Sequence, residues 1–145
     1  MINKKNNSKK IIGYTCGVFD MFHIGHLNLL KNAKKKCDYL IVGVTKDELV
    51  KYKNKKTVIN ENDRKEIVGS IKYVDEVIWQ EDIDKYKAWE KLNFNCLFVG
   101  DDWKGNENWK IWELKLKEKN VEVIYFPYTK SISSTLLKKK LNIDP

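Results

Sequence analysis

The sequence predicts an α/β fold in which a parallel five-stranded sheet carries helices on both faces. Short apolar runs alternate with amphipathic runs along the 145 residues, which is the pattern of strands joined by crossover helices. The run "YLIVGV", Tyr39–Val44, is apolar throughout, as expected of a parallel strand buried on both faces. No linker rich in proline, glycine or serine and no internal repeat interrupts this pattern, so one domain is expected.

The first part of the chain shows the two periodicities clearly. Ile11–Cys16 is expected to be the first strand. The helix that follows, over Ile24–Lys36, places apolar residues on one face, namely Leu27, Leu30 and Ala33. Tyr39–Val44 is the second strand.

A second helix is expected over Glu61–Ile71. Asn60 suits the N-cap of this helix, and Asp63 occupies the capping-box position. The later elements continue the alternation: strands at Val74–Trp79, Cys96–Val99 and Val121–Phe126, and helices at Tyr86–Leu92, Glu107–Lys119 and Ser133–Leu141.

The composition sets limits on the class of protein. Residues 1–10 are basic and polar and are expected to form a disordered tail, leaving residues 11–145 as the single domain. No apolar run approaches the ~18 residues that a membrane span needs, and the chain start does not resemble a signal peptide. Cys16, Cys37 and Cys96 have neither disulfide-framework nor zinc spacing. Free thiols favour a reducing cytoplasm.

The formal net charge of +8 would suit a polyanionic partner. Lysine is spread along the whole chain, however, and much of this charge is explained by solvated surface. No basic stripe interleaved with aromatic residues is present, so nucleic acid is not an expected partner. Charge alone does not identify the ligand.

The unusual polar stretches all follow predicted strands. They are "GVFDMFHIGH", "TKDELVKYKNKK", "QED", "GDDWKG" and "PYTKSISST". In parallel sheets, ligands bind outside the carboxyl ends of the strands. The sequence therefore predicts one polar site at this edge of the sheet.

His23 and His26, the only histidines in the chain, flank Gly25 at a predicted helix start. A zinc pair, a pair of core histidines and a phosphate site are the three alternatives. Zinc would need a further protein ligand, such as Asp20 or Cys16. A helix N-terminus with a glycine and two imidazole donors favours phosphate.

Cationic and hydroxyl side chains add to the phosphate interpretation. "KYKNKK", which includes Lys53, Lys55 and Lys56, is either a solvated charge run or a mobile clamp on a polyanion. Arg64 is the only arginine in the chain, which suggests a need for a bidentate contact with phosphate. "SISST" holds more hydroxyls than capping requires. These features suggest a nucleoside triphosphate, and without a P-loop or kinase signature, attack at the α-phosphate is a natural option.

"GVFDMFHIGH" resembles the nucleotidyltransferases that carry the HxGH motif, which have a Rossmann-like fold. Further matching stretches are "CDYLIVGVTKDEL", "DRKEIVGSIKYVDEVI", "VGDDWKG" and "YTKSISST". Together they cover about Ile11 to Leu141, and the similarity is greatest to the small bacterial glycerol-3-phosphate cytidylyltransferases. "NENDRKEIVGSIKYVDEV" is also similar to choline- and ethanolamine-phosphate cytidylyltransferases.

The resemblance implies roles for individual residues. With the lone arginine, the expected catalytic set is His23, His26, Lys55 and Arg64. The expected nucleotide-binding set is Gly17, Val18, Phe19, Asp20, His23, Gly25, His26, Lys55, Lys72, Asp102, Trp103, Tyr128, Thr129, Ser131, Ile132, Ser133, Ser134 and Thr135. Lys53 and Lys85 would bind the second substrate.

The resemblance also implies Mg²⁺ bound with CTP, with Asp20 helping to organise the site or this ion, no protein-bound metal, and a homodimer. Two positions depart from the family pattern RTxGIST: Tyr128 replaces its arginine and Ser131 replaces its glycine. Losing the arginine removes a fork-shaped phosphate donor. The identity of the acceptor is therefore open.

The expected activity is transfer of CMP from CTP to a small phosphorylated alcohol such as glycerol 3-phosphate, forming a CDP-alcohol and pyrophosphate. The alternatives are a choline-, ethanolamine-, sugar- or polyol-phosphate cytidylyltransferase and an adenylyltransferase of the same fold. A non-catalytic nucleic-acid or nucleotide-binding module is the rival from another class.

Overall fold

A computed structural model describes residues 10–52, 55–100, 107–127, 129 and 132–143. Its centre is a five-stranded sheet with the order β3-β2-β1-β4-β5. Every pair of neighbouring strands is parallel. The predicted fold class, a parallel five-stranded sheet between helices, is confirmed. The strands are β1 (Ile12–Gly17), β2 (Tyr39–Thr45), β3 (Glu76–Gln80), β4 (Cys96–Gly100) and β5 (Glu122–Phe126).

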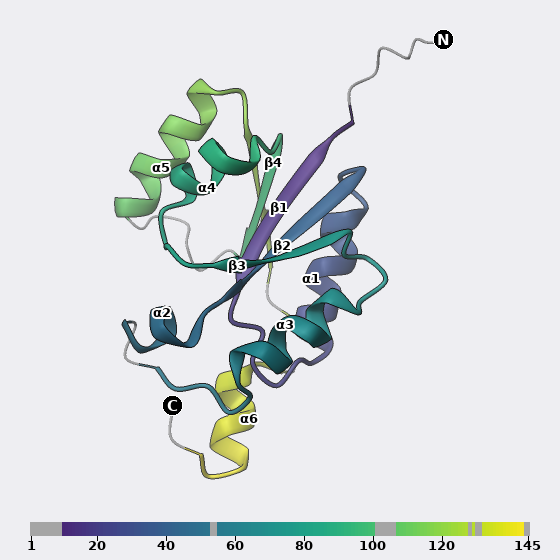
Figure 1. The fold of residues 1–145 in the computed structure, drawn as a ribbon, viewed down its shortest axis with the longest axis vertical. Helices are drawn as coiled ribbons and strands as arrows, with labels where there is room; N and C mark the ends of the chain where they lie inside the picture. Colours follow the sequence, from purple (N-terminus) through teal and green to yellow (C-terminus); the bar gives the residue numbers. More distant parts are fainter. Residues whose placement is uncertain (1–9, 53–54, 101–106, 128, 130–131, 144–145) are drawn as a thin grey trace.

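The helices lie on both faces of the sheet and at its carboxyl edge (Figure 1). They are α1 (Ile24–Lys34), α2 (Asp47–Tyr52), α3 (Glu61–Gly69), α4 (Lys85–Leu92), α5 (Glu107–Glu118) and α6 (Ser134–Lys140). The expected N-cap Asn60 is confirmed, because its side chain accepts from the Asp63 amide, and Ser133 caps α6, because its Oγ accepts from the Leu136 amide. Both contacts satisfy amides that the helix itself leaves unpaired.

Two hydrophobic cores fix the helices to the sheet. On one face, Leu30 and Ala33 of α1 and Val68 of α3 pack against β2 and β4. On the other face, Trp109 and Leu116 of α5 pack against β1, β2 and β4, joined by side chains of α4. Because β2 has helices over both faces, its residues from Leu40 to Thr45 are all buried, as its continuous apolar run predicts.

The strand order places the site. The chain runs outward from β1 through β2 to β3 and then returns to β4 on the other side of β1. The crevice at such a reversal, at the carboxyl ends of the strands, is where ligands bind in open α/β sheets. Figure 1 shows α2 and α6 at this end of the sheet.

The structure also differs from the expectations in detail. The segment after β2 forms the short helix α2, where the sequence suggested only a lysine-rich segment. Asp47 and Glu48 lie in its first turn, where carboxylates favour a helix start. The strand expected at Val74–Trp79 begins at Glu76 and ends at Gln80. The tail expected over residues 1–10 lies almost entirely outside the described residues, and the single-domain assignment stays a prediction.

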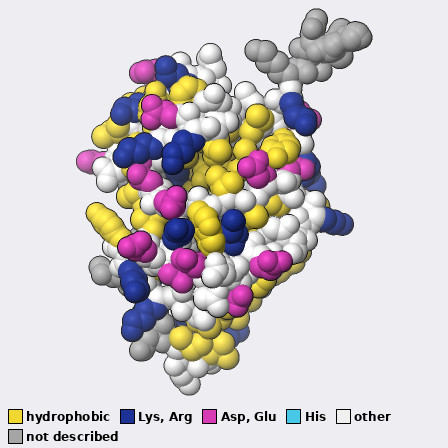
Figure 2. All heavy atoms as spheres, in the orientation of Figure 1, with side chains coloured by type: hydrophobic (Ala, Val, Ile, Leu, Met, Phe, Trp, Pro, Cys, Tyr) yellow, Lys and Arg dark blue, Asp and Glu magenta, His cyan; other side chains and the backbone are white. Residues whose placement is uncertain are grey.

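The described helices include none with the length and apolar character needed to cross a membrane. On the face drawn in Figure 2, Lys and Arg side chains are interspersed with Asp and Glu side chains. That mixture agrees with solvated surface charge as the explanation for much of the basic composition.

Candidate active site

A cavity of about 590 Å³ opens at the carboxyl ends of the strands. This volume is typical of a site for a nucleotide-sized ligand. Five separate stretches of sequence line the cavity. The first runs from the end of β1 through the following loop into α1, and the second lies at the end of α2 and just after it. The other three begin at the carboxyl ends of β3, β4 and β5, and the last of these continues into α6.

The loop between β1 and α1 has an unusual backbone. Phe19 and Met21 have positive φ angles of 54° and 49°, which residues other than glycine rarely adopt. The loop is held by burial of Phe19 and by Asp20, whose two carboxylate oxygens accept from the Val58 and Ile59 amides at 2.8 and 2.9 Å. These contacts offset the backbone strain. They set the position of His23, the next functional side chain in the loop.

His23 and His26 cap α1 with their own side chains. His23 is the N-cap, and its Nδ1 accepts from the Gly25 amide at 3.0 Å. His26 is the third helical residue, and its Nδ1 accepts from the His23 amide at 3.2 Å. Because both Nδ1 atoms accept hydrogen bonds, a neutral ring must carry its proton on Nε2. The backbone thus assigns the same tautomer to both histidines.

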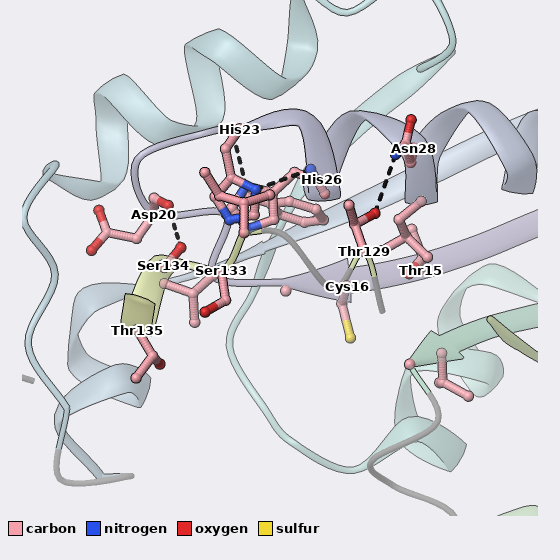
Figure 3. A pocket seen from close by; sticks show the side chains of 18 of the residues that line it. Thr15, Cys16, Asp20, His23, His26, Asn28, Thr129, Ser133, Ser134 and Thr135 are labelled. Carbon is pink, nitrogen blue, oxygen red and sulfur yellow. Dashed lines mark hydrogen bonds between the residues drawn. The ribbon is translucent and has the colours of Figure 1, made fainter. Parts of the chain in front are cut away.

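The two rings stack with centroids 3.8 Å apart and lie beside the hydroxyls of α6 (Figure 3). His23 Nε2 is buried and has no hydrogen-bond partner among the described residues. A buried polar atom without a partner is uncommon and marks a place where a ligand can bind. Gly25 is needed for this arrangement, since an added Cβ would lie 2.9 Å from His23 Cε1.

The surroundings favour the neutral form of both imidazoles. Burial lowers the pKa of His26 to about 3, helped by the neighbouring His23 and opposed by the charge of Asp20. Burial also lowers the pKa of His23. Desolvation disfavours the charged form of an imidazole. The pair is therefore suited to donate two hydrogen bonds to an anion without carrying positive charge itself.

Arg64 is fully buried and hydrogen-bonds to the segment that follows β1, to the end of β2 and to the segment that precedes α3. Its Nη1 donates to the carbonyl oxygens of Val18 at 2.7 Å and Thr45 at 2.9 Å, and its Nε donates to that of Ile59 at 2.9 Å. Its Nη2 forms an ion pair with Asp47. Burial tends to raise the pKa of Asp47, but hydrogen bonds from Arg64 and Thr57 lower it overall. The guanidinium is turned toward protein oxygens, and Arg64 is not part of the described cavity lining.

Among the described residues, four lysines line the cavity: Lys55, Lys56, Lys85 and Lys138. Lys85 is 5% exposed and its Nζ donates to the Ile83 carbonyl at 3.3 Å. Asp20 is the acidic side chain in the described lining. The described lining therefore carries excess positive charge, which favours a polyanion.

Most of the predicted site residues meet in the cavity. The lining includes Gly17, Val18, Phe19, Asp20, His23, Gly25, His26, Lys55, Lys85, Thr129, Ile132, Ser133, Ser134 and Thr135. Lys72 is not part of this lining: it is exposed in the turn before β3, with Nζ 5.3 Å from the centre of the Tyr73 ring. Lys53, Asp102, Trp103, Tyr128 and Ser131 fall outside the described residues.

Some cavity residues were not singled out from the sequence. Asn28 and Asn32 lie one turn apart on α1, and the Asn28 amide donates to Thr129 Oγ1 at 3.2 Å. Gln80 and Lys138 also line the cavity. The spacing of the two asparagines after His26 is a usable signal, since residues four apart share a helix face. Nothing in the sequence distinguishes Lys138 from its neighbours Lys139 and Lys140.

Comparison with known proteins identifies the class. The sequence profile of the family described as "Cytidylyltransferase-like" matches residues 14–140. The chain therefore belongs to the cytidylyltransferase-like family and is a nucleotidyltransferase. This result confirms the family resemblance predicted from the HxGH motif.

Particular relatives narrow the comparison. Glycerol-3-phosphate cytidylyltransferase of Bacillus spizizenii is 42% identical over 137 residues, covering 92% of this chain and 97% of the relative. FAD synthase of Archaeoglobus fulgidus is 36% identical over 108 residues, covering 74% of this chain and 78% of the relative. The solved structure of a lipopolysaccharide core biosynthesis protein from Thermoplasma volcanium matches with a TM-score of 0.70 at 27% identity, covering 83% of this chain and 98% of that protein.

The described residues do not fit a resident metal ion. They contain no group of three or more His, Cys, Asp or Glu side chains placed to hold one. Both Nδ1 atoms of the histidines are used by the backbone, and the Asp20 carboxylate is used by two amides and lies 3.7 Å from Lys138 Nζ. The zinc alternative therefore receives no support from this part of the chain.

We expect the two histidines to be neutral Nε2–H tautomers in solution. Since these are the only histidines, ¹⁵N-histidine labelling and long-range ¹H–¹⁵N spectra report on them alone. His26 should remain neutral down to about pH 5, well below the usual imidazole pKa. Because the unfolded chain binds more protons than the native state between pH 6.5 and about 3, His26 should also destabilise the fold progressively as pH falls through that window. Titration of His26 near pH 6.5, or a proton on Nδ1, would contradict the assignment.

We expect Arg64→Leu to act on stability first. Removing the guanidinium leaves three carbonyl oxygens and Asp47 without their partner, at a cost of about 3–5 kcal/mol in the free energy of unfolding. Urea unfolding measures this loss, and the exposed Lys36→Leu serves as the matched control, with an expected change within about 0.5 kcal/mol. An Arg64→Leu protein of unchanged stability that has lost activity would instead assign Arg64 a direct role in catalysis.

Proposed function

We propose that this protein transfers CMP from CTP to a small phosphorylated alcohol, with glycerol 3-phosphate as the leading candidate. The single observation that carries the proposal is the pair of imidazoles that the capping box fixes at the start of α1 in a lysine-lined cavity, with the buried Nε2 of His23 left without a partner among the described residues. Family membership and the glycerol-3-phosphate cytidylyltransferases at 37–42% identity support the same reaction.

The reaction needs no covalent intermediate on the protein. An oxygen of the acceptor's phosphate attacks the α-phosphorus of CTP, and the bond from that phosphorus to the α–β bridging oxygen breaks. Pyrophosphate leaves with the electron pair. The attacking phosphate is already largely ionised near neutral pH, so no general base is required. Positioning and stabilisation of charge on the phosphates then account for catalysis.

The proposed role of His23 and His26 is to donate Nε2–H hydrogen bonds to the phosphates of CTP as charge shifts toward the leaving group. Their donors are preorganised, because the capping contacts orient both rings before the ligand arrives. Preorganised donors lose little energy to rearrangement during the reaction. The start of α1 adds its backbone dipole to the same phosphates.

The remaining assignments follow the charge of the cavity. Lys55 and the hydroxyls of residues 133–135 are proposed to hold CTP. Lys85 is proposed to hold the acceptor's phosphate, and Lys53, which lies outside the described residues, is proposed to do so as well. Asp102, Trp103, Tyr128 and Ser131 also lie outside the described residues and stay proposals as parts of the nucleotide site. Lys72 is described but does not line the cavity, so the geometry gives no support to a role for it in nucleotide binding.

Three further features belong to the proposal. Mg²⁺ would arrive bound to the phosphates of CTP and would neutralise part of their charge. The protein would act as a homodimer, and it would work in the cytoplasm. The free cysteines, Cys16, Cys37 and Cys96, support a reducing compartment.

A second candidate is adenylyl transfer. FAD synthases at 34–37% identity cover most of this chain, so ATP and a phosphorylated flavin are the alternative substrates. The HxGH geometry suits either nucleotide, because the histidines would contact phosphates rather than a base. The two candidates differ in both substrates and can be separated in one assay.

The test is a pyrophosphate-release panel. The protein is incubated with CTP or ATP, with Mg²⁺, and with glycerol 3-phosphate, phosphocholine, phosphoethanolamine, a sugar phosphate or flavin mononucleotide. We expect release with CTP and a phosphorylated alcohol, and none from ATP with the flavin. Release only in the ATP and flavin arm would establish the second candidate, and no release in any arm would refute both.

The same assay includes His23→Ala and His26→Ala. Each variant removes one phosphate donor, so kcat should fall by roughly 10²–10³-fold. Circular dichroism checks that the variants remain folded, since each also removes a helix cap. Folded variants with unchanged kcat would eliminate the proposed role of the histidines.

A further inference from the structure

Lys138 is a buried lysine whose partners come from two other parts of the chain. It lies on α6, is 9% exposed and forms part of the cavity lining. Its Nζ donates to the carbonyl oxygen of Lys56 at 2.6 Å and lies 3.7 Å from Asp20 Oδ2. Burying an ammonium group is costly unless hydrogen bonds and an opposite charge compensate it. The position of Lys138 is therefore defined by these two oxygens.

The carboxylate of Asp20 already binds the segment that follows the lysines. Its oxygens accept from the amides of Val58 and Ile59. Its backbone carbonyl accepts from Ser134 Oγ at 2.6 Å, a contact drawn in Figure 3. The β1–α1 loop, the segment at residues 56–59 and α6 are thus joined around Asp20 and Lys138, next to the histidines.

Lys55 immediately precedes the carbonyl group that Lys138 holds. The Lys55 amide donates to the Val50 carbonyl at 3.3 Å, and its side chain is exposed in the cavity wall. The backbone around Lys55 is therefore fixed on one side by α2 and on the other by Lys138. An exposed lysine binds a ligand more strongly when its backbone is already fixed, because the lysine then loses less conformational entropy on binding.

The charge of Lys138 has a second consequence. Asp20 is the acidic side chain in the described lining, and an uncompensated carboxylate there would repel a triphosphate. Lys138 lies between Asp20 and the lysine segment and offsets this charge. The same ammonium group therefore supports the backbone beside Lys55 and reduces repulsion in the cavity.

We propose that Lys138 is a positioning residue for CTP, acting chiefly through Lys55. This inference rests on the proposed function, in which Lys55 holds the triphosphate. It assigns to the end of α6 a role separate from that of the hydroxyls at its start. It also explains why a lysine is buried at this one position of a helix whose neighbouring lysines, Lys139 and Lys140, are exposed.

The experiment measures Mg·CTP affinity by calorimetry without acceptor, so that no reaction occurs. Lys138→Met should weaken CTP binding about tenfold, the range expected for loss of a charged hydrogen bond. Lys139→Met, the same change one residue further on an exposed side chain, should bind CTP like the wild type. Lys138→Arg, which keeps the charge and the donors, should retain most of the affinity.

A double-mutant cycle separates positioning from direct contact. On a Lys55→Met background, Lys138→Met should cause little further loss, because its effect passes through Lys55. Fully additive losses, or equal affinities of the Lys138→Met and Lys139→Met proteins, would overturn the inference. If Lys138→Met does not fold, Lys138→Ala, which also removes the donor but leaves room for water at the Lys56 carbonyl, takes its place in the cycle.

The test is independent of the acceptor. Failure of the wild type to bind CTP would count against the proposed function itself. Wild-type binding together with a null result at Lys138 would count against this inference alone.

Discussion

The guanidinium of Arg64 has to find oxygen partners inside the fold, because a buried charge without them would be destabilising. Its partners are the carbonyls of Val18, Thr45 and Ile59 and the carboxylate of Asp47. These groups lie at the end of β1, the end of β2, the segment before α3 and the start of α2. One buried side chain therefore holds together the segments that surround the cavity.

The backbone of the β1–α1 loop and of the first turn of α1 orients the two histidines. The β1–α1 loop places His23 at the helix N-cap and His26 in the first turn, and each Nδ1 accepts an amide proton. The helix start thus orients both rings and leaves Nε2–H for a ligand. Burial lowers the pKa of both rings and so favours their neutral form, which can donate hydrogen bonds while the surrounding lysines provide the positive charge. The histidines thus donate hydrogen bonds and the lysines supply charge. This division suits a reaction in which negative charge moves along the phosphates toward the leaving group.

The fold and the location of the cavity could be predicted from the sequence, because parallel strands and their carboxyl ends follow from the apolar pattern. The helix α2 was not anticipated, since six residues beside a lysine run carry little periodicity. The lone Arg64 was expected to matter, but composition does not show whether its donors turn toward a ligand or into the protein. The tautomer of the histidines and the role of Lys138 depend on contacts between distant segments, with Lys138 being one of 28 lysine and arginine residues.

The central claim is that the Nε2–H groups of His23 and His26 face the triphosphate. A crystal structure of the protein with CTP tests this claim most directly. The account predicts that both Nε2 atoms lie within about 3.2 Å of phosphate oxygens, with the amides of Gly25 and His23 still bonded to the two Nδ1 atoms. A triphosphate bound away from both Nε2 atoms, or contacting Nδ1 after rotation of the rings, would contradict it.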